Sequence, residues 1–291
     1  MSDLPSEVKR KVLEMQKGEI TEHFIYEALS RATKDSGNKE ILRRIASEER
    51  RHYDLWKRHT NEDIKPDRWL VWRYCFISRT LGLTFGLKLM ERGEQKAEAA
   101  YDALAQYVPE AREIAREEDN HEKQLISLID EERLQYIGAI VLGLNDALVE
   151  LTGALSGFTL ALQNTRLIAV VGLITGIAAS MSMAGSEYLA TKSEEDARSP
   201  LKSAVYTGFA YILTVMLLIF PYFIFSNVFF SFGLMIFIAI SVIFHFTFYM
   251  SVVKEISFKH RFLEMAAVSL GIAALSFVIG FLIRTFLGVD I

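Results

Sequence analysis

The stretch LQYIGAIVLGLNDALVELTGALSGFTLAL, from Leu134 to Leu162, decides the fold class. As a helix it is long enough to cross a bilayer core of about 30 Å. Its only charged residues are Asp146 and Glu150. The charges of the chain divide at this point, because 24 of the 32 Lys and Arg residues and 27 of the 36 Asp and Glu residues precede Leu134. The first part therefore has the composition of a soluble protein, and the second part that of a membrane domain.

Further apolar runs follow, and each is long enough to span a bilayer as a helix. The sequence therefore predicts an all-α protein with two domains, residues 1–133 and residues 134–291. The fourth span follows the third directly through a turn predicted between Pro221 and Asn227. We place the five spans at Leu134–Leu162, Leu167–Leu189, Ala204–Asn227, Val228–Val253 and Met265–Phe286.

The basic residues between the spans predict the orientation. They follow the second and fourth spans, at Lys192, Arg198, Lys202, Lys254, Lys259 and Arg261. By the positive-inside rule, the N-terminal domain lies in the cytoplasm and the C-terminus across the cell membrane. No basic segment followed by an apolar run begins the chain, so no cleavable signal peptide is expected.

The overall charge and the single cysteine exclude other classes. A net charge of −4 with no basic block does not favour nucleic acid as a partner. Cys75 is the sole cysteine, which excludes an internal disulfide framework and gives no support to a thiolate metal site.

The N-terminal part has strong helical periodicity and few turn signals, with breaks predicted at Ser36-Gly37 and Val108-Pro109. The segment from Trp69 to Met90 is unusually apolar, yet its basic residues disfavour a sixth span. We expect it to pack in the bundle or to lie on the membrane surface. Short links between four helices predict an up-down bundle, with helices near Pro5–Lys34, Asn38–Thr60, Trp69–Tyr107 and Pro109–Glu132.

Two of these helices carry a glutamate and a histidine three residues apart. Glu49 and His52 form one pair, and Glu118 and His121 form the other, so each pair shares a helical face. Glu19 and Glu94 are the matching glutamates of the remaining helices. Carboxylate and imidazole suit Fe²⁺ and Mn²⁺, and buried glutamates facing one another require a cation. The sequence predicts a di-metal site.

Other acidic residues fall on the same faces as the predicted ligands. They are either extra ligands or outer residues that support them. Tyr26 and Tyr101 lie two turns beyond a ligand glutamate, and we expect both to pack in the core. The additional acidic candidates are Glu22, Glu91 and Glu98.

These stretches resemble rubrerythrin and its erythrin-type relatives over residues 19–26, 48–52, 93–101 and 117–123. The resemblance implies a ferritin-like bundle with an Fe²⁺/Fe³⁺ di-iron site. The family's second glutamate of the third helix falls at Ala97, which leaves Glu91, Glu98 or no residue as a seventh ligand. The sequence shows no cysteine-ligated rubredoxin segment, so peroxidase activity fed by one is not expected. The implied ligands are Glu19, Glu49, His52, Glu94, Glu118 and His121.

Ionisable residues within a span are costly and usually mark an ion path. Asp146 and Glu150 lie four residues apart in the first span, and Met183 and Glu187 do so in the second. Carboxylates with a thioether suit a transition metal better than Mg²⁺ or Ca²⁺. A buried structural hydrogen bond is the alternative for Asp146, and core packing is the alternative for Met183. Small residues are expected to allow close helix contacts, at Gly138, Gly143, Gly153, Gly157, Gly172, Gly176 and Gly185.

The motifs Asn145-Asp146 and Ser182-Met183 through Glu187-Tyr188 resemble the vacuolar iron transporter family. The resemblance implies five spans, a homodimer, and Fe²⁺ or Mn²⁺ moved out of the cytoplasm in exchange for protons. Vacuolar members have a long acidic insert after the second span, whereas here the link is only Ala190 to Ser203. The combination of both parts resembles the membrane-bound ferritin-type proteins, which export iron.

The leading hypothesis is therefore an iron or manganese exporter with a cytoplasmic di-iron domain that binds, oxidises or senses the metal. The alternative is an enzyme, a membrane-anchored ferroxidase or peroxide reductase whose spans are only a tether. A third hypothesis makes the bundle a sensor that gates the pore. The ligand set does not distinguish iron from manganese.

Overall fold

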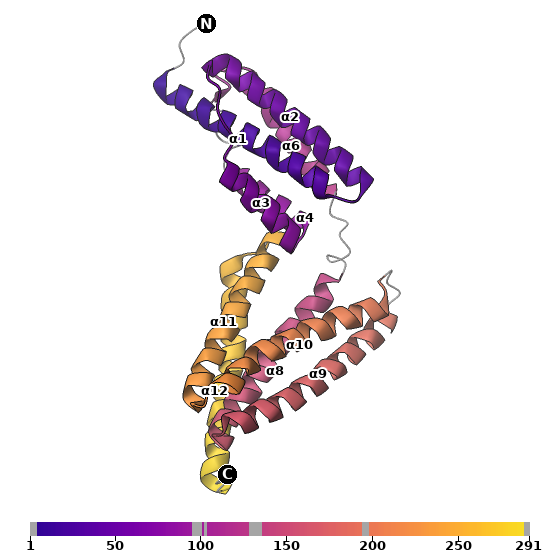
Figure 1. Cartoon of the computed structure of the whole chain (residues 1–291), viewed down its shortest axis with the longest axis vertical. Coiled ribbons are helices and arrows are strands. Elements are labelled where there is room, and N and C mark those ends of the chain that lie inside the picture. Colours follow the sequence, from indigo (N-terminus) through magenta and orange to yellow (C-terminus); the bar gives the residue numbers. More distant parts are fainter. Residues whose placement is uncertain (1–4, 95–100, 102–103, 128–135, 194–197, 288–291) are drawn as a thin grey trace. The chain divides into compact units, whose positions relative to one another are not determined.

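A computed structural model describes residues 5–94, 101, 104–127, 136–193 and 198–287, with the backbone alone at 91–94, 122, 126–127 and 287. All the elements that it describes are helices, which confirms the all-α class (Figure 1). The contacts divide the chain into two compact units, Met1–Glu131 and Glu132–Ile291.

The first unit begins with two long helices that lie side by side (Figure 1). They are α1 (Ser6–Ala32) and α2 (Ser36–Thr60). The break between them lies before Ser36, because the carboxylate of Asp35 accepts a hydrogen bond from the backbone N–H of Asn38 and caps α2. Ser36-Gly37, predicted as the break, is instead the first turn of α2.

The single long third helix predicted from Trp69 to Tyr107 is wrong. The structure has α3 (Arg68–Leu81) and then α4 (Leu83–Glu94). Gly82 separates them with φ of 106°, a backbone conformation that strongly favours glycine. The stretches 95–100 and 102–103 of the predicted helix lie outside the described residues.

Two apolar clusters hold the first unit together. One contains Ile25, Leu42 and Ile45 with Tyr26, which packs in the core as predicted. The other contains Val12 and Trp56 with Leu104, Val108 and the first turns of α6 (Ala111–Ser127). Burying each large side chain stabilises the fold by about 1.5–3 kcal/mol. The facing sides of α1 and α2 are thereby fixed in register. The complete four-helix bundle stays a prediction.

The second unit has five helices, each long and apolar enough to cross a membrane, which confirms the predicted number of spans among the described residues. The helix bounds extend beyond several predicted spans. The third helix continues through Pro221, so the turn falls at 225–227, after the proline. The helices are α8 (Ile137–Leu162), α9 (Thr165–Ser193), α10 (Pro200–Ile224), α11 (Val228–Val253) and α12 (Phe258–Leu287).

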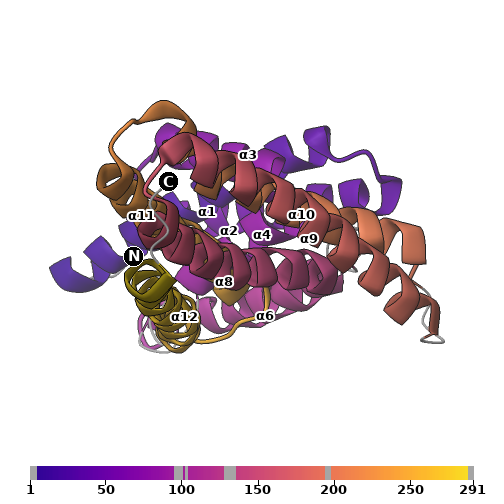
Figure 2. The same ribbon diagram turned by 90° about the horizontal axis from the view of Figure 1, so that it is seen from below.

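Helix α8 contacts all four of the other helices in this unit (Figure 2). Small residues permit the closest approaches: a Cβ on Gly143 would lie 2.3 Å from the carbonyl oxygen of Thr207 in α10. Five of the seven predicted glycines meet a neighbouring helix in this way, whereas Gly138 and Gly185 have nothing within 4 Å. The five are Gly143, Gly153, Gly157, Gly172 and Gly176.

Gly143→Ala is expected to lower the thermal unfolding midpoint of the detergent-solubilised protein. Its new methyl group meets backbone of α10, which cannot move aside like a flexible side chain. Overpacking of about 1–3 kcal/mol outweighs the helix-propensity gain of up to about 1 kcal/mol. Gly138→Ala on the same helix is the control and should leave the midpoint unchanged or raise it. Equal midpoints for the two variants would contradict this packing.

Candidate functional site

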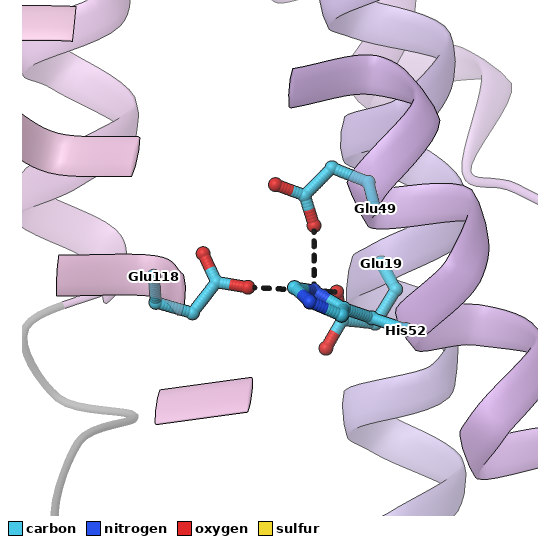
Figure 3. Close-up of side chains that lie close together, drawn as sticks. All are labelled: Glu19, Glu49, His52 and Glu118. Atoms are coloured by element: carbon cyan, nitrogen blue, oxygen red, sulfur yellow. Dashed lines mark ion pairs between the residues drawn. The ribbon is translucent and has the colours of Figure 1, made fainter. Parts of the chain in front are cut away.

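Four side chains from three helices of the first unit converge on one point (Figure 3). Glu19 comes from α1, Glu49 and His52 come from α2, and Glu118 comes from α6. One ligand atom from each lies within 4.8 Å of the others. Glu19, Glu49 and His52 are buried at 3%, 1% and 1% exposure, so the group is a candidate metal site.

The histidine of α6, His121, extends this group. Glu49 directs one oxygen toward each imidazole, with Oε2 3.6 Å from Nδ1 of His52 and Oε1 3.1 Å from Nδ1 of His121. Glu118 does the same, at 3.0 Å from His52 and 3.4 Å from His121. Glu19 lies 3.3 Å from Nδ1 of His52. Two imidazoles therefore face two shared carboxylates.

A second layer of acids orients both imidazoles. Nε2 of His52 lies 2.6 Å from Oε2 of Glu117, and Nε2 of His121 lies 2.6 Å from Oε2 of Glu48. Such outer carboxylates fix the ring orientation of a ligating histidine and make it more basic. Neither acid was predicted to have a role. The signal was present, because each precedes a ligand glutamate directly.

Glu19 is positioned by aromatic donors. Its Oε1 accepts a hydrogen bond of 2.9 Å from the indole N–H of Trp56 and one of 3.4 Å from the hydroxyl of Tyr101. Its Oε2 remains directed at His52. Tyr101 packs in the core as predicted and also orients a candidate ligand. Trp56 was not predicted, because it lies one turn beyond His52 on α2 and carries no ligand atom.

The electrostatics of the group reflect its burial. Burial raises the pKa of Glu19 well above its usual range, and Glu118 and Glu49 raise it further. Burial also acts to raise the pKa of Glu49, but His121 and His52 outweigh it and lower that pKa to about 2. Burial acts to lower the pKa of His121, yet Glu118 and Glu49 raise it to about 10. Without a metal, both charge signs are therefore held inside this site.

Several buried polar atoms of this group make no hydrogen bond, which indicates that the residues fit a metal. Among the described residues, ten buried side-chain atoms make no hydrogen bond, and five of the ten belong to the residues of this group. Buried polar atoms normally have a partner, and a cation would supply one here. Carboxylate oxygens with imidazole nitrogens suit Fe²⁺ or Mn²⁺. The atoms are Oε2 of Glu19, Oε2 of Glu49, Nδ1 of His52, Oε1 of Glu118 and Nδ1 of His121.

The other predicted ligands are not among the described side chains that converge here. Glu22 lies on α1 but is not a member of the converging group. Glu91 and Glu94 belong to α4, and their side chains lie outside what the structure describes. Glu98 also lies outside the described residues. Their roles as ligands stay predictions.

Metal binding at this site is expected to release protons. A ligating imidazole must be neutral, whereas the raised pKa keeps a proton on His121 up to about pH 10. Protons therefore compete with the metal below that pH, and the apparent affinity for Mn²⁺ should rise about tenfold per pH unit for each proton released. Titration of the full chain with Mn²⁺ in weakly buffered detergent solution, followed with a pH indicator, measures the release. An affinity that does not change with pH would contradict it.

In the second unit, α10 contacts two of the four predicted path residues. The hydroxyl of Tyr211 donates a hydrogen bond of 2.8 Å to Oε2 of Glu150. Oε1 of Glu187 accepts hydrogen bonds from Ser203 at 2.6 Å and from Thr191 at 3.2 Å. Tyr211 and Ser203 were not predicted, because only tertiary packing places α10 beside the acids, whereas Thr191 lies four residues after Glu187 on α9 itself.

Asp146 and Met183 are both half-buried. Met183 packs against the apolar core of the second unit, whereas Asp146 lies one turn before Glu150 on α8. Glu150 remains exposed on the surface of this unit despite its hydrogen bond. Among the described residues, no hydrogen bond or ion pair joins Asp146 or Glu150 to Glu187. A shared path for the four stays a prediction.

Comparison with known proteins bears on the second unit. Residues 137–199 match the sequence model of the VIT family, the vacuolar iron transporters. No curated protein and no solved structure matches the chain. The match, together with the five apolar helices, supports an integral membrane protein with a VIT-type membrane domain and indicates metal-ion transport. It does not extend over the first unit, so the resemblance to rubrerythrin stays a prediction.

Proposed function

We propose that the protein exports Fe²⁺ or Mn²⁺ from the cytoplasm in exchange for protons. The observation that carries this proposal is the VIT family match, because it covers the two helices that hold all four predicted path residues. In this proposal Asp146, Glu150, Met183 and Glu187 line the path. A carboxylate can hold either a cation or a proton, which is the physical basis of exchange between the two.

The exposure of Glu150 supports a homodimer. An ionisable side chain facing lipid costs several kcal/mol, so such residues face a protein interior or a water-filled cavity. Glu150 lies midway along an apolar helix and is exposed on a single copy of the unit. A second copy packed on this face of α8 would remove the acid from lipid. The path would then run between two copies of α8.

The first unit is proposed to hold two metal ions in the cytoplasm. Glu49 and Glu118 direct one oxygen toward each imidazole, so these two acids would hold the metals together with Glu19, His52 and His121. Glu94 is the predicted counterpart of Glu19. Bound iron would supply redox chemistry between Fe²⁺ and Fe³⁺. The protein's own part is to orient the ligands through Trp56, Glu48 and Glu117, and to keep the site buried.

Metal flux in sealed proteoliposomes tests the transporter. We expect Fe²⁺ to cross the membrane faster than in protein-free vesicles. The flux should be faster still when the proton concentration is higher on the side that Fe²⁺ enters, because protons then move in the opposite direction. Movement of protons in the opposite direction should accompany the metal. Flux that does not respond to the gradient would overturn the proton exchange, and an absence of flux would overturn the transporter.

A second function has its own observation. The buried cluster of carboxylates and imidazoles in the first unit would also suit a membrane-anchored ferroxidase or peroxide reductase. In that case the five helices are only a tether, and Asp146 and Glu150 have no role. Metal-dependent consumption of oxygen or peroxide by protein that shows no flux would favour this second function.

A further inference from the structure

Helix α3 presents a stripe of large aromatic side chains to solvent. Trp69, Trp72 and Phe76 are 63%, 61% and 54% exposed, whereas the third tryptophan, Trp56, is fully buried. The spacing of three and four residues places the stripe on one face of the helix. The rings of Trp72 and Phe76 are stacked, with centroids 5.5 Å apart. Soluble surfaces rarely expose such a contiguous apolar patch without a partner.

Arginines border this stripe. Arg68 and Arg79 are exposed along one margin, and the guanidinium of Arg73 lies over the ring of Trp69, 5.2 Å from its centroid, on the other margin. The helix contains no Asp or Glu, although the whole chain carries a net charge of −4. The face is therefore aromatic at its centre and cationic at its edges.

The opposite face of α3 is anchored in the first unit. Val71 and Tyr74 pack against the apolar cluster that contains Ile25 and Leu42. At the N-terminal end, the carboxylate of Asp67 caps the helix through the backbone N–H of Leu70. The aromatic stripe thus projects from a fixed helix, and its exposure does not result from an unpacked segment.

A lipid surface is within reach of this helix because the first unit is tethered to membrane-spanning helices. Helix α6 ends at Ser127 and α8 begins at Ile137. Fully extended, the chain between these two residues spans about 35 Å at most. Such a short tether keeps the bilayer close to the stripe, at a high effective concentration. A separate protein partner would not have this advantage.

We propose that α3 is a membrane-docking helix whose aromatic stripe inserts into the headgroup region of the bilayer that holds the second unit. Tryptophan prefers this region, where its ring meets acyl chains and its indole N–H meets water. Arg68, Arg73 and Arg79 face anionic lipid phosphates, and their aliphatic stems cover the edge of the stripe. Docking holds the first unit against the membrane surface. The inference needs only an embedded second unit and does not depend on what that unit transports.

Intrinsic fluorescence tests the proposal in the full-length protein, because all three tryptophans lie in the first unit. The protein is placed in nanodiscs that contain anionic lipid, with or without bromine atoms on the upper part of the acyl chains. We expect brominated lipid to quench Trp69 and Trp72 and to leave Trp56 bright. The double variant Trp69→Phe/Trp72→Phe, in which Trp56 is the only reporter, should show no quenching.

A charge placed in the stripe provides the matched comparison. Phe76→Glu keeps all three tryptophans and puts a carboxylate among anionic headgroups, so the quenching by brominated lipid should be largely lost. Phe24→Glu adds the same charge at an exposed aromatic of α1 and should quench as the unchanged protein does. Mn²⁺ binding measured on each variant confirms that the first unit remains folded.

Two other results would each overturn the proposal. In one, brominated lipid does not quench and the tryptophans are protected from acrylamide only when a nanodisc holds two copies, which identifies a second copy of this chain as the occupant of the stripe. In the other, Trp69 and Trp72 are open to acrylamide whatever the copy number, which leaves the stripe in water. Equal quenching in Phe76→Glu and the unchanged protein would also count against docking.

Discussion

Replacing Asp146 by alanine is expected to reduce proton-coupled Fe²⁺ flux in proteoliposomes to the level of protein-free vesicles. Asp146 lies within an apolar helix, one turn before Glu150, and its carboxylate is one of the groups proposed to exchange a metal for a proton. Alanine removes both the cation ligand and the proton acceptor. Within a low-dielectric span, no other anion on that turn of α8 can replace it.

The same variant separates the two units. Asp146 lies in the second unit and the candidate metal site lies in the first, so Asp146→Ala should bind Mn²⁺ in detergent as tightly as the unchanged protein does. Glu264→Ala is the control for loss of an acid from the second unit, because Glu264 is exposed near the start of α12 and pairs with Arg261. It should retain flux. Full flux in Asp146→Ala would remove Asp146 from the path.

Replacing Glu49 by glutamine is expected to abolish tight metal binding by the first unit. Glu49 directs one oxygen toward His52 and the other toward His121, so one substitution would remove a charge that both sides of the proposed metal site share. Losing an outer residue that only orients a ligand typically costs 10- to 100-fold in affinity, about the range expected for Glu117→Gln. Glu49→Gln should cost clearly more, measured by Mn²⁺ titration of the full chain.

The control for Glu49→Gln is Glu40→Gln, on the same helix but exposed to solvent. It should bind Mn²⁺ like the unchanged protein. Removing one partner of a buried charged pair can destabilise a fold by about 3–5 kcal/mol, so each variant needs a thermal unfolding measurement without metal. A folded Glu49→Gln protein with unchanged affinity would remove Glu49 from the proposed metal site. Fe²⁺ flux by the Glu49→Gln variant then shows whether transport depends on metal binding in the first unit.

In the membrane unit, the sequence predicted the acidic residues but not their hydrogen-bond partners. Asp146 and Glu150 could be found because any charge in a long apolar run is conspicuous. Tyr211, which contacts Glu150 from α10, could not be found, since a tyrosine in an apolar helix has the same pattern whether it packs or donates a hydrogen bond. The same holds for Ser203 and its contact with Glu187.

The first unit shows the same division. The glutamate and the histidine of each pair share a helical face by spacing alone, so each pair was predictable, whereas the meeting of the two pairs depends on packing between helices. The break of the third helix at Gly82 was not, because a single glycine within a helical pattern is usually tolerated and only its positive φ shows that the helix ends.

By itself, the sequence determined the all-α class, the five membrane helices and the residues able to bind a metal, because these follow from local periodicity, hydropathy and charge. Tertiary structure alone decided that Glu49 and Glu118 face both histidines, that Trp56 orients Glu19, and that Glu48 and Glu117 orient the imidazoles. It also decided that the aromatic stripe of α3 faces outward. The physical reason is that a repeat along one helix specifies which residues share a face. Which side chain of another helix meets that face depends on packing between segments far apart in the sequence.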